Sequence, residues 1–268
     1  MAEGRPVLAA GQAVAVAGDP AGNVATAARL TRRAGDRGAD VLVLPEAFLT
    51  GYDAPVFAGA LPDVADHQGP LLDPLRDAAR AAGTTVVVGT AVDRGERRTL
   101  STALVRPDGT VSLPYDKQHL DGLERTHFQP GDHGTSVAVA GVELGLSICY
   151  DGCFPEHARS AAADGALGYL ASAAYFPGGA HRRDLYYAAR ALDNGFYVVL
   201  SGLTGPCGIS RFIGGSAIYD PEGRPLARLD EEEGVVVAEL DPELVAATRA
   251  RHTMHEDHRP GLGQRVRV

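Results

Sequence analysis

Cys149 is the residue of this sequence best placed to act as a nucleophile. It follows the apolar run Leu144–Ile148, and Gly152 and a predicted helix near Pro155–Arg159 come soon after it. A strand, a sharp turn and a helix in this order expose the side chain at the turn, and a nearby helix N-terminus favours the thiolate form of cysteine. A lone cysteine is more often a small buried hydrophobe, so the pattern gains weight only from the residues that accompany it.

Two further segments carry groups that a thiol nucleophile requires. Glu46 follows the apolar strand predicted for Val41–Leu44, and partial desolvation there would raise the pKa of its carboxyl group and suit it to act as a base. Lys117 is the single lysine among 25 Lys and Arg residues. A compact ammonium has a tunable pKa and a shape that a guanidinium cannot reproduce. Each signal is weak alone, but together they predict covalent catalysis by a thiol.

The elements that must position these residues are predicted to alternate between strand and helix. Apolar strands such as those at 41–44 and 85–89 are hydrophobic on both faces, which indicates packed layers on each side of a sheet. We therefore predict an α/β protein built as a four-layer α-β-β-α sandwich of two mixed sheets. The predicted strands are Val7–Ala17, Val41–Leu44, Thr85–Thr90, Leu100–Val105, Ser136–Val139, Val142–Ile148, Leu167–Ala171, Tyr197–Gly202, Ser216–Tyr219 and Gly234–Leu240. The predicted helices are Asn23–Arg37, Leu72–Ala82, His157–Asp164, His181–Asn194 and Pro242–Arg251.

Turn chemistry sets the expected boundaries of these elements. Asn23 is a preferred N-cap residue type, and Gly38 and Gly83 are placed to end helices. The chain has 268 residues and no composition break that would mark a linker. We therefore expect a single domain over residues 1–268, with a polar C-terminal tail over about 252–268.

Composition narrows the class of protein. The net charge is −9, which makes nucleic acid and anionic membranes poor partners. No apolar run reaches the length of a membrane-spanning helix, and three cysteines without a secretory context argue against a disulfide framework, so we expect a cytoplasmic protein. His252, His255 and His258 are typical of a solvated tail, and Cys149 and Cys153 have no companions that complete a zinc set. No metal or organic cofactor is expected.

Several segments together resemble a known family. LPEAFLTGY, YDKQHL and ICYDGCFPEHAR are similar to the three signature blocks of the nitrilase superfamily, the carbon–nitrogen hydrolases. GLERTHFQPGD resembles the segment that holds the second glutamate of the family, and AARALDNGFYVV and GGSAIYDPEGRPLA resemble its later core segments. The resemblance covers essentially the whole chain, in order.

The resemblance implies a role for each reactive residue. Cys149 would be the nucleophile, Glu46 the general base, and Lys117 the cation that stabilises the oxyanion, while Glu124 matches the second glutamate that positions the lysine and the substrate. The backbone N–H of Tyr150 would be a second oxyanion donor. The family fold is an α-β-β-α sandwich that dimerises, so a homodimer or larger homo-oligomer acting on a small-molecule substrate is implied.

Residues beside the nucleophile indicate the branch of the family. Tyr150 and Asp151 replace the Trp-Glu that usually follows the cysteine of nitrilases, which speaks against nitriles as the main substrate. Gly152 and Cys153 replace the adjacent arginines of N-carbamoyl-D-amino acid hydrolases, and Cys153 also stands where the ω-amidase type has an arginine. The pattern favours a small-molecule amide, with an N-carbamoyl amine as the alternative. Asp116, where the family commonly has arginine, could alter the field at the lysine, although neighbours on a strand point to opposite faces.

Aromatic residues near these segments are candidates for the substrate pocket. We expect substrate binding by Tyr52, Tyr150, Phe154 and Tyr175, with Phe176 as a further candidate. Arg182 and Arg183 would either face a substrate carboxylate or lie solvated at the start of a helix.

Two readings from other functional classes stay open at this point. A Cys–His protease of another fold would use His119 or His157 as its base, and Glu46 would be dispensable. A catalytically silent binding protein would have an unreactive Cys149 thiol.

Overall fold

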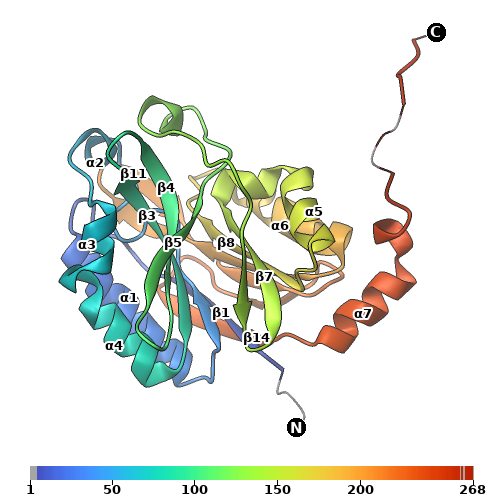
Figure 1. Ribbon diagram of the computed structural model, residues 1–268, viewed down its shortest axis with the longest axis horizontal. Helices are drawn as coiled ribbons and strands as arrows, with labels where there is room; N and C mark the ends of the chain where they lie inside the picture. The colour runs from blue at the N-terminus through green and yellow to red at the C-terminus, as the bar shows by residue number, and fades with distance from the viewer. Residues whose placement is uncertain (1–4, 260, 262, 268) are drawn as a thin grey trace.

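The computed structural model of the protein describes residues 5–259, 261 and 263–267, and two six-stranded sheets dominate it (Figure 1). The first sheet contains β1 (Val7–Gln12), β2 (Val41–Val43), β3 (Thr85–Asp93), β4 (Arg98–Val105), β5 (Val111–Asp116) and β14 (Gly234–Glu239). The second contains β6 (Ser136–Val139), β7 (Val142–Ile148), β8 (Gly168–Ala173), β9 (Tyr197–Gly202), β12 (Ala217–Tyr219) and β13 (Pro225–Arg228). A separate hairpin joins β10 (Thr204–Cys207) to β11 (Ser210–Ile213).

Both sheets are mixed and have the same internal plan. The strand orders are β14-β1-β2-β3-β4-β5 and β13-β12-β9-β8-β7-β6. The central strands β1, β2 and β3 of the first sheet pair in parallel, as do β7, β8 and β9 of the second, and the outer pairs are antiparallel. Because parallel strands end at the same edge of a sheet, the turns after β2 and β7 are the natural places for functional side chains.

Helices cover the outer face of each sheet (Figure 1). The principal helices are α1 (Pro20–Gly35), α4 (Asp73–Ala82), α5 (Pro155–Ala163), α6 (Ala180–Asn194) and α7 (Pro242–Arg251). Shorter turns are α2 (Ala54–Ala58), α3 (Val64–Gln68), η1 (Pro70–Leu72), η2 (Glu124–Thr126), η3 (Cys149–Cys153) and η4 (Thr253–His255). Helices α1 and α4 lie on the first sheet, and α5 and α6 lie on the second. No described helix has the length and apolar character needed to cross a membrane.

Three apolar cores hold these layers together, and alternation along the strands creates them. In β2, Leu42 faces the helices on the outer face of the first sheet, whereas Val41 and Val43 face the second sheet. Leu146 and Leu170 from the second sheet complete this central core. The outer core of the second sheet lies under α5 and α6. The observed layers confirm the predicted α-β-β-α sandwich.

Some predicted boundaries are wrong. The first strand ends at Gln12 rather than Ala17, because its ladder partners in β2 and β14 extend no further. The Gln12 side chain is then held by the Asp230 carbonyl, to which its amide donates over 2.7 Å. Strand β5 was not predicted, since it carries Pro114 and alternates weakly, and a proline is tolerated in the edge strand of a sheet.

The first helix also begins earlier than predicted. It starts at Pro20, and the Asp19 side chain caps it by accepting from the Gly22 N–H. Asn23 is not the N-cap, and its side chain pairs with the N–H and the carbonyl of Val16. This helix ends at the residue Gly35, whereas Gly83 does end α4 in the left-handed conformation as predicted. The expected tail begins after α7. Its first turn, η4, lies against α6, and the described residues beyond η4 lead away from the body (Figure 1).

Candidate active site

Glu46 lies in a tight turn directly after β2. Its side chain is 1% exposed. The turn packs against Gly89 of β3, whose N–H donates to the Pro45 carbonyl over 3.0 Å. A Cβ at Gly89 would lie 2.5 Å from the nitrogen of Ala47 and from the oxygen of Pro45. Only glycine therefore allows the turn that carries Glu46 to approach β3 this closely.

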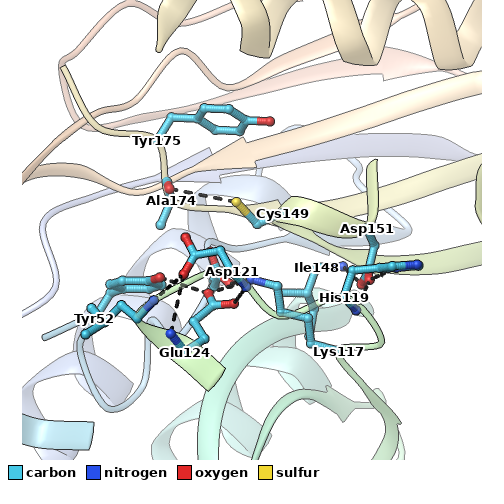
Figure 2. Close-up of polar contacts among 12 residues, drawn as sticks. Tyr52, Lys117, His119, Asp121, Glu124, Ile148, Cys149, Asp151, Ala174 and Tyr175 are labelled. Carbon is cyan, nitrogen blue, oxygen red and sulfur yellow. Dashed lines mark hydrogen bonds and ion pairs between the residues drawn. The ribbon is translucent and has the colours of Figure 1, made fainter. Parts of the chain in front are cut away.

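Lys117 follows β5 and joins two carboxylates that are remote from each other in sequence. Its backbone N–H donates to the Leu100 carbonyl over 2.7 Å. Its ammonium Nζ donates to Glu124 Oε1 over 2.6 Å (Figure 2). It also donates to Glu46 Oε1 over 2.6 Å, and all three side chains are 1% exposed. A buried ammonium with two carboxylates is held in one orientation, because each charge would be costly to leave unpaired.

Other residues fix Glu124 but leave one oxygen of Glu46 free. Tyr52 Oη donates to Glu124 Oε1 over 2.8 Å, and the Asp121 N–H donates to Glu124 Oε2 over 2.9 Å. Within the described part of the chain, the buried Glu46 Oε2 has no hydrogen-bond partner. A buried carboxylate oxygen without a partner is available to take a proton from a neighbouring group or a substrate.

Cys149 begins the short turn η3 and adopts a backbone conformation that is unusual for its type. Its φ of 44° lies in the left-handed region, which is the sharp turn expected of an elbow between β7 and α5. The sulfur lies 3.8 Å from the carbonyl oxygen of Ala174, the residue directly after β8. The predicted order of strand, turn and helix around the cysteine is therefore observed.

The buried side chain of Asp151 stabilises this turn by accepting several hydrogen bonds. It is fully buried and accepts hydrogen bonds from the Ile148 N–H over 3.0 Å, from Tyr115 Oη over 2.6 Å, and from the N–H of His119 over 2.9 Å. His119 Nδ1 also lies 2.9 Å from the same carboxylate. These contacts connect the turn after β7 to β5 and to the segment that carries Lys117.

Burial and the charged neighbours shift the titration of all three central groups. Burial raises the pKa of Glu46 to about 8, and the Lys117 charge only partly opposes this. Burial acts to lower the pKa of Lys117, but the charges of Glu46 and Glu124 outweigh it, so the ammonium stays protonated. Burial, assisted by the Glu46 charge, raises the pKa of Cys149 well above its usual range. Burial and the Glu46 charge therefore favour the neutral thiol, in contrast to the thiolate expected from the position of Cys149 at a turn before a helix.

A cavity of about 290 Å³ opens onto the Cys149 sulfur. Three of the four predicted pocket residues line it, namely Tyr52, Tyr150 and Tyr175. Phe154 does not, because its ring stacks on His119 with centroids 3.8 Å apart and lines a neighbouring cavity instead. Further lining residues are Lys117, Asp121, Cys153, Ala174, Phe176, Pro177, Gly179, Arg182 and Tyr186.

Asp121 and Tyr186 are polar lining residues that were not predicted from the sequence, in addition to the small residues Ala174, Pro177 and Gly179. Asp121 lies only three residues before Glu124, and this closeness in sequence to a candidate site residue could have identified it. Tyr186 lies one helical turn after Arg182 on α6, and that spacing alone would have placed the two on one face of the helix. Arg183 instead forms an ion pair with Asp184 over 2.7 Å and donates to backbone carbonyls, which makes its role structural.

The acid beside the lysine points away from it. Asp116 pairs with Arg94 over 2.7 Å and with Arg97 over 3.1 Å, and it accepts from Ser101 over 2.6 Å. Its charge is therefore compensated on the opposite face of the strand, as the alternation of side chains predicts.

Comparisons with known proteins agree with this geometry. The carbon–nitrogen hydrolase family model matches residues 7–250. A (R)-stereoselective amidase from Pseudomonas sp. is 36% identical over 247 residues, covering 90% of this chain and 87% of that protein. A 2-oxoglutaramate amidase from Bacillus subtilis is 34% identical over 229 residues, covering 84% of this chain and 86% of that protein.

The solved structures to which this chain is similar are also amidases. A crystal structure of an amidase from Nesterenkonia sp. has a TM-score of 0.82 and 30% identity, covering 94% of this chain and 97% of that one. A variant of that amidase carries the acetamide moiety of fluoroacetamide bound covalently at its active-site cysteine, with a TM-score of 0.82, 28% identity, and coverage of 96% of this chain and 98% of that one.

The chain therefore belongs to the carbon–nitrogen hydrolase family. Within that family its relatives and structural neighbours define it as an amidase-like hydrolase of carbon–nitrogen bonds. The reading as a Cys–His protease of another fold is wrong. The two histidines it would need have other partners: His119 contacts Asp151, and His157 lies between Tyr115 and Tyr169.

Proposed function

We propose that the protein hydrolyses a small-molecule amide through a thioester on Cys149, with Glu46 as general base and Lys117 as the oxyanion-stabilising cation. One observation carries this proposal. The ammonium of Lys117 is fixed between Glu46 and Glu124, while the second oxygen of Glu46 stays unpartnered and the cavity opens on the thiol.

The first half of the reaction forms the acyl-enzyme. Glu46 takes the thiol proton as the sulfur of Cys149 attacks the amide carbonyl carbon, and the carbonyl electron pair moves to oxygen. Lys117 and the Tyr150 N–H stabilise this oxyanion, a contribution typically worth about 3 kcal/mol for one donor. The tetrahedral intermediate then collapses, the carbon–nitrogen bond breaks, and Glu46 returns the proton to the leaving ammonia or amine.

The second half releases the acid. Glu46 takes a proton from water, the hydroxide adds to the thioester carbonyl, and the carbon–sulfur bond breaks. The proton returns to the sulfur, so the enzyme ends in its starting state. Glu124 acts on Lys117 rather than on the substrate carbon, because both of its oxygens are already engaged. No step requires a metal or an organic cofactor.

Substrate size follows from the cavity. About 290 Å³ lies at the lower end of the range for ligand sites, which favours a compact acyl group over a peptide. Aromatic walls from Tyr52, Tyr150 and Tyr175 suit an apolar acyl chain. A related structure in the same family holds butyramide, which supports a short aliphatic amide as the first substrate to test, ahead of an N-carbamoyl amine.

The test is ammonia release from a panel of aliphatic amides, N-carbamoyl amines, N-carbamoyl amino acids and nitriles, with Cys149→Ala run beside the wild type. We expect release from short amides to fall by at least about 1,000-fold in the variant, because the nucleophile is lost. Release that persists in Cys149→Ala would remove the thioester. Release from carbamoyl amines alone would replace the amide by the alternative substrate class.

The last part of the proposal concerns domain organisation, cellular location and oligomeric state. We infer a single-domain cytoplasmic enzyme that forms a homodimer or a larger homo-oligomer. The outer face of α6 supports this, because Leu185 and Leu192 are 58% and 42% exposed there and would be covered by a second copy. Light scattering after size exclusion, with Leu185→Glu beside the wild type, tests the oligomeric state: a wild-type mass of one chain contradicts it.

A further inference from the structure

Two side chains of helix α6 donate hydrogen bonds to backbone carbonyls of the turn that carries Cys149. Tyr187 Oη donates to the Cys149 carbonyl oxygen over 3.0 Å. Arg190 Nε donates to the Gly152 carbonyl over 2.9 Å, and Arg190 also reaches the Cys153 carbonyl. Tyr187 is fully buried and Arg190 is 5% exposed, so neither contact competes with bulk water. Neither side chain lines the cavity beside the thiol.

The contact made by Tyr187 has a consequence for the neighbouring N–H. The Cys149 carbonyl and the Tyr150 N–H belong to the same peptide unit, which is planar and trans, so the two groups point in opposite directions. Tyr187 pulls the carbonyl toward α6, and this turns the N–H away from α6. Outside the turn itself, no described residue accepts a hydrogen bond from that N–H, which leaves it available to a ligand.

Gly152 makes room for this arrangement. A Cβ at position 152 would lie 2.7 Å from Cε1 of the Tyr187 ring and 3.0 Å from its hydroxyl oxygen. The φ of Gly152 is not in the left-handed region, so the glycine is required by the close approach of the ring rather than by the backbone. The tyrosine and the glycine therefore act as a pair.

We propose that Tyr187 is a positioning residue for the oxyanion site: through the Cys149–Tyr150 peptide it aims the Tyr150 N–H at the oxygen of the tetrahedral intermediate, in the space that Gly152 leaves open. The inference rests on the proposed thioester mechanism. It adds a residue that affects the stabilisation of the oxyanion but not the reactivity of the Cys149 thiol.

Two measurements separate these two effects in Tyr187→Phe. Hydrolysis of an amide requires the oxyanion donors, whereas alkylation of Cys149 by iodoacetamide is a displacement at a saturated carbon that forms no oxyanion. We expect kcat to fall by about 10-fold to 50-fold with KM changed less than about 2-fold, because an aligned donor is lost only in the transition state. The rate of alkylation should stay within about 2-fold of the wild type.

Tyr197→Phe is the matched control. Tyr197 is also buried, and its hydroxyl accepts from the N–H of Asp241, far from the nucleophile turn. Removing this hydroxyl should leave both rates unchanged. Gly152→Ala provides a second route to the same defect, because the new methyl group displaces the phenol without removing it, and we expect the same selective loss of kcat.

Each outcome decides the proposal. A wild-type kcat in both variants overturns it. A parallel fall in the rates of hydrolysis and alkylation also overturns it, because Tyr187 would then only stabilise the turn that carries Cys149. If Tyr187→Phe fails to fold, as judged by thermal unfolding, Gly152→Ala alone decides. Failure of the thioester mechanism is distinguishable, because it would show as amide hydrolysis that survives Cys149→Ala.

Discussion

At the scale of single residues, the site is a set of charges whose titration depends on burial. Glu46, Lys117 and Glu124 are almost fully removed from solvent, and the ammonium is the only cation that contacts the two carboxylates among the described residues. Burial raises the pKa of Glu46 and of Cys149 alike. Each of these two groups therefore holds its proton more tightly than it would in water, and loss of the thiol proton depends on the carboxylate form of Glu46.

Substitution of the base tests the division of labour. In Glu46→Gln we expect kcat/KM for the best amide to fall by about 100-fold to 10,000-fold, because the amide side chain cannot accept the thiol proton. The substitution keeps the shape of the side chain and the hydrogen bond from Lys117. Thermal unfolding within a few degrees of the wild type is the control, and activity within about 3-fold of the wild type would contradict the role of Glu46.

The raised pKa of Glu46 also predicts a pH profile. Its carboxylate is the active form, and its pKa lies at about 8 instead of the ordinary value of 4.5. Hydrolysis should therefore rise between pH 6 and 8 and level off above that range, with log kcat/KM measured on a neutral amide at constant ionic strength. The rate of alkylation of Cys149 should rise over the same pH range. A profile already flat above pH 6 would mean that the pKa of Glu46 is not raised.

At the scale of elements, strand ends place the reactive residues and glycines set how closely the turns pack. Glu46 follows β2, Lys117 follows β5, and Cys149 follows β7, and each turn is anchored to a neighbouring strand or helix. The elbow is held from β5 by Asp151 and from α6 by Tyr187. Strain at a φ of 44° persists because these contacts outweigh it.

Gly89→Ala tests the packing of the Glu46 turn. The added methyl group would meet backbone atoms of Pro45 and Ala47 at 2.5 Å, and backbone cannot move aside as a flexible side chain does. We expect the free energy of unfolding to fall by about 1–3 kcal/mol and kcat by about 100-fold, because the base is displaced. Gly134→Ala is the control, since nothing lies within 4 Å of its Cβ and its φ is not positive. Full activity in Gly89→Ala would show that this contact does not position Glu46.

At the scale of the whole molecule, the core between the two sheets keeps the three turns in register. β2 and β7 belong to different sheets, so the distance between Glu46 and Cys149 depends on how the sheets pack face to face. Leu170 of β8 is fully buried in this core, together with Val43 and Leu146. Stability and catalytic geometry are thus linked through the same layer.

Truncation of this core should be costly. Leu170→Ala should lower the free energy of unfolding by about 2–5 kcal/mol, from the lost burial and the cavity left behind. Leu226→Ala, at a side chain that is 50% exposed, should change it by less than about 0.5 kcal/mol. Urea unfolding followed by circular dichroism measures both, and equal midpoints for the two variants would contradict the assignment of Leu170 to the core.

The amino-acid pattern predicted the candidate reactive residues, and it predicted the α/β layering and the elbow at Cys149 that the structure shows. These features are local: periodicity along a strand and the residue types at its end are both written in a few consecutive positions. The lone lysine and the aromatic residues Tyr52, Tyr150 and Tyr175 were recognised in the same way.

The environments of those residues depend on contacts that form only in the folded chain. Lys117 and Glu46 are 71 positions apart, and Tyr187 reaches the Cys149 carbonyl across 38 positions, so neither contact has a local signature. The neutral resting thiol and the position of Phe154 outside the cavity likewise follow from packing. A pKa and a side-chain direction are sums over neighbours that the fold brings together, and no short pattern contains that sum.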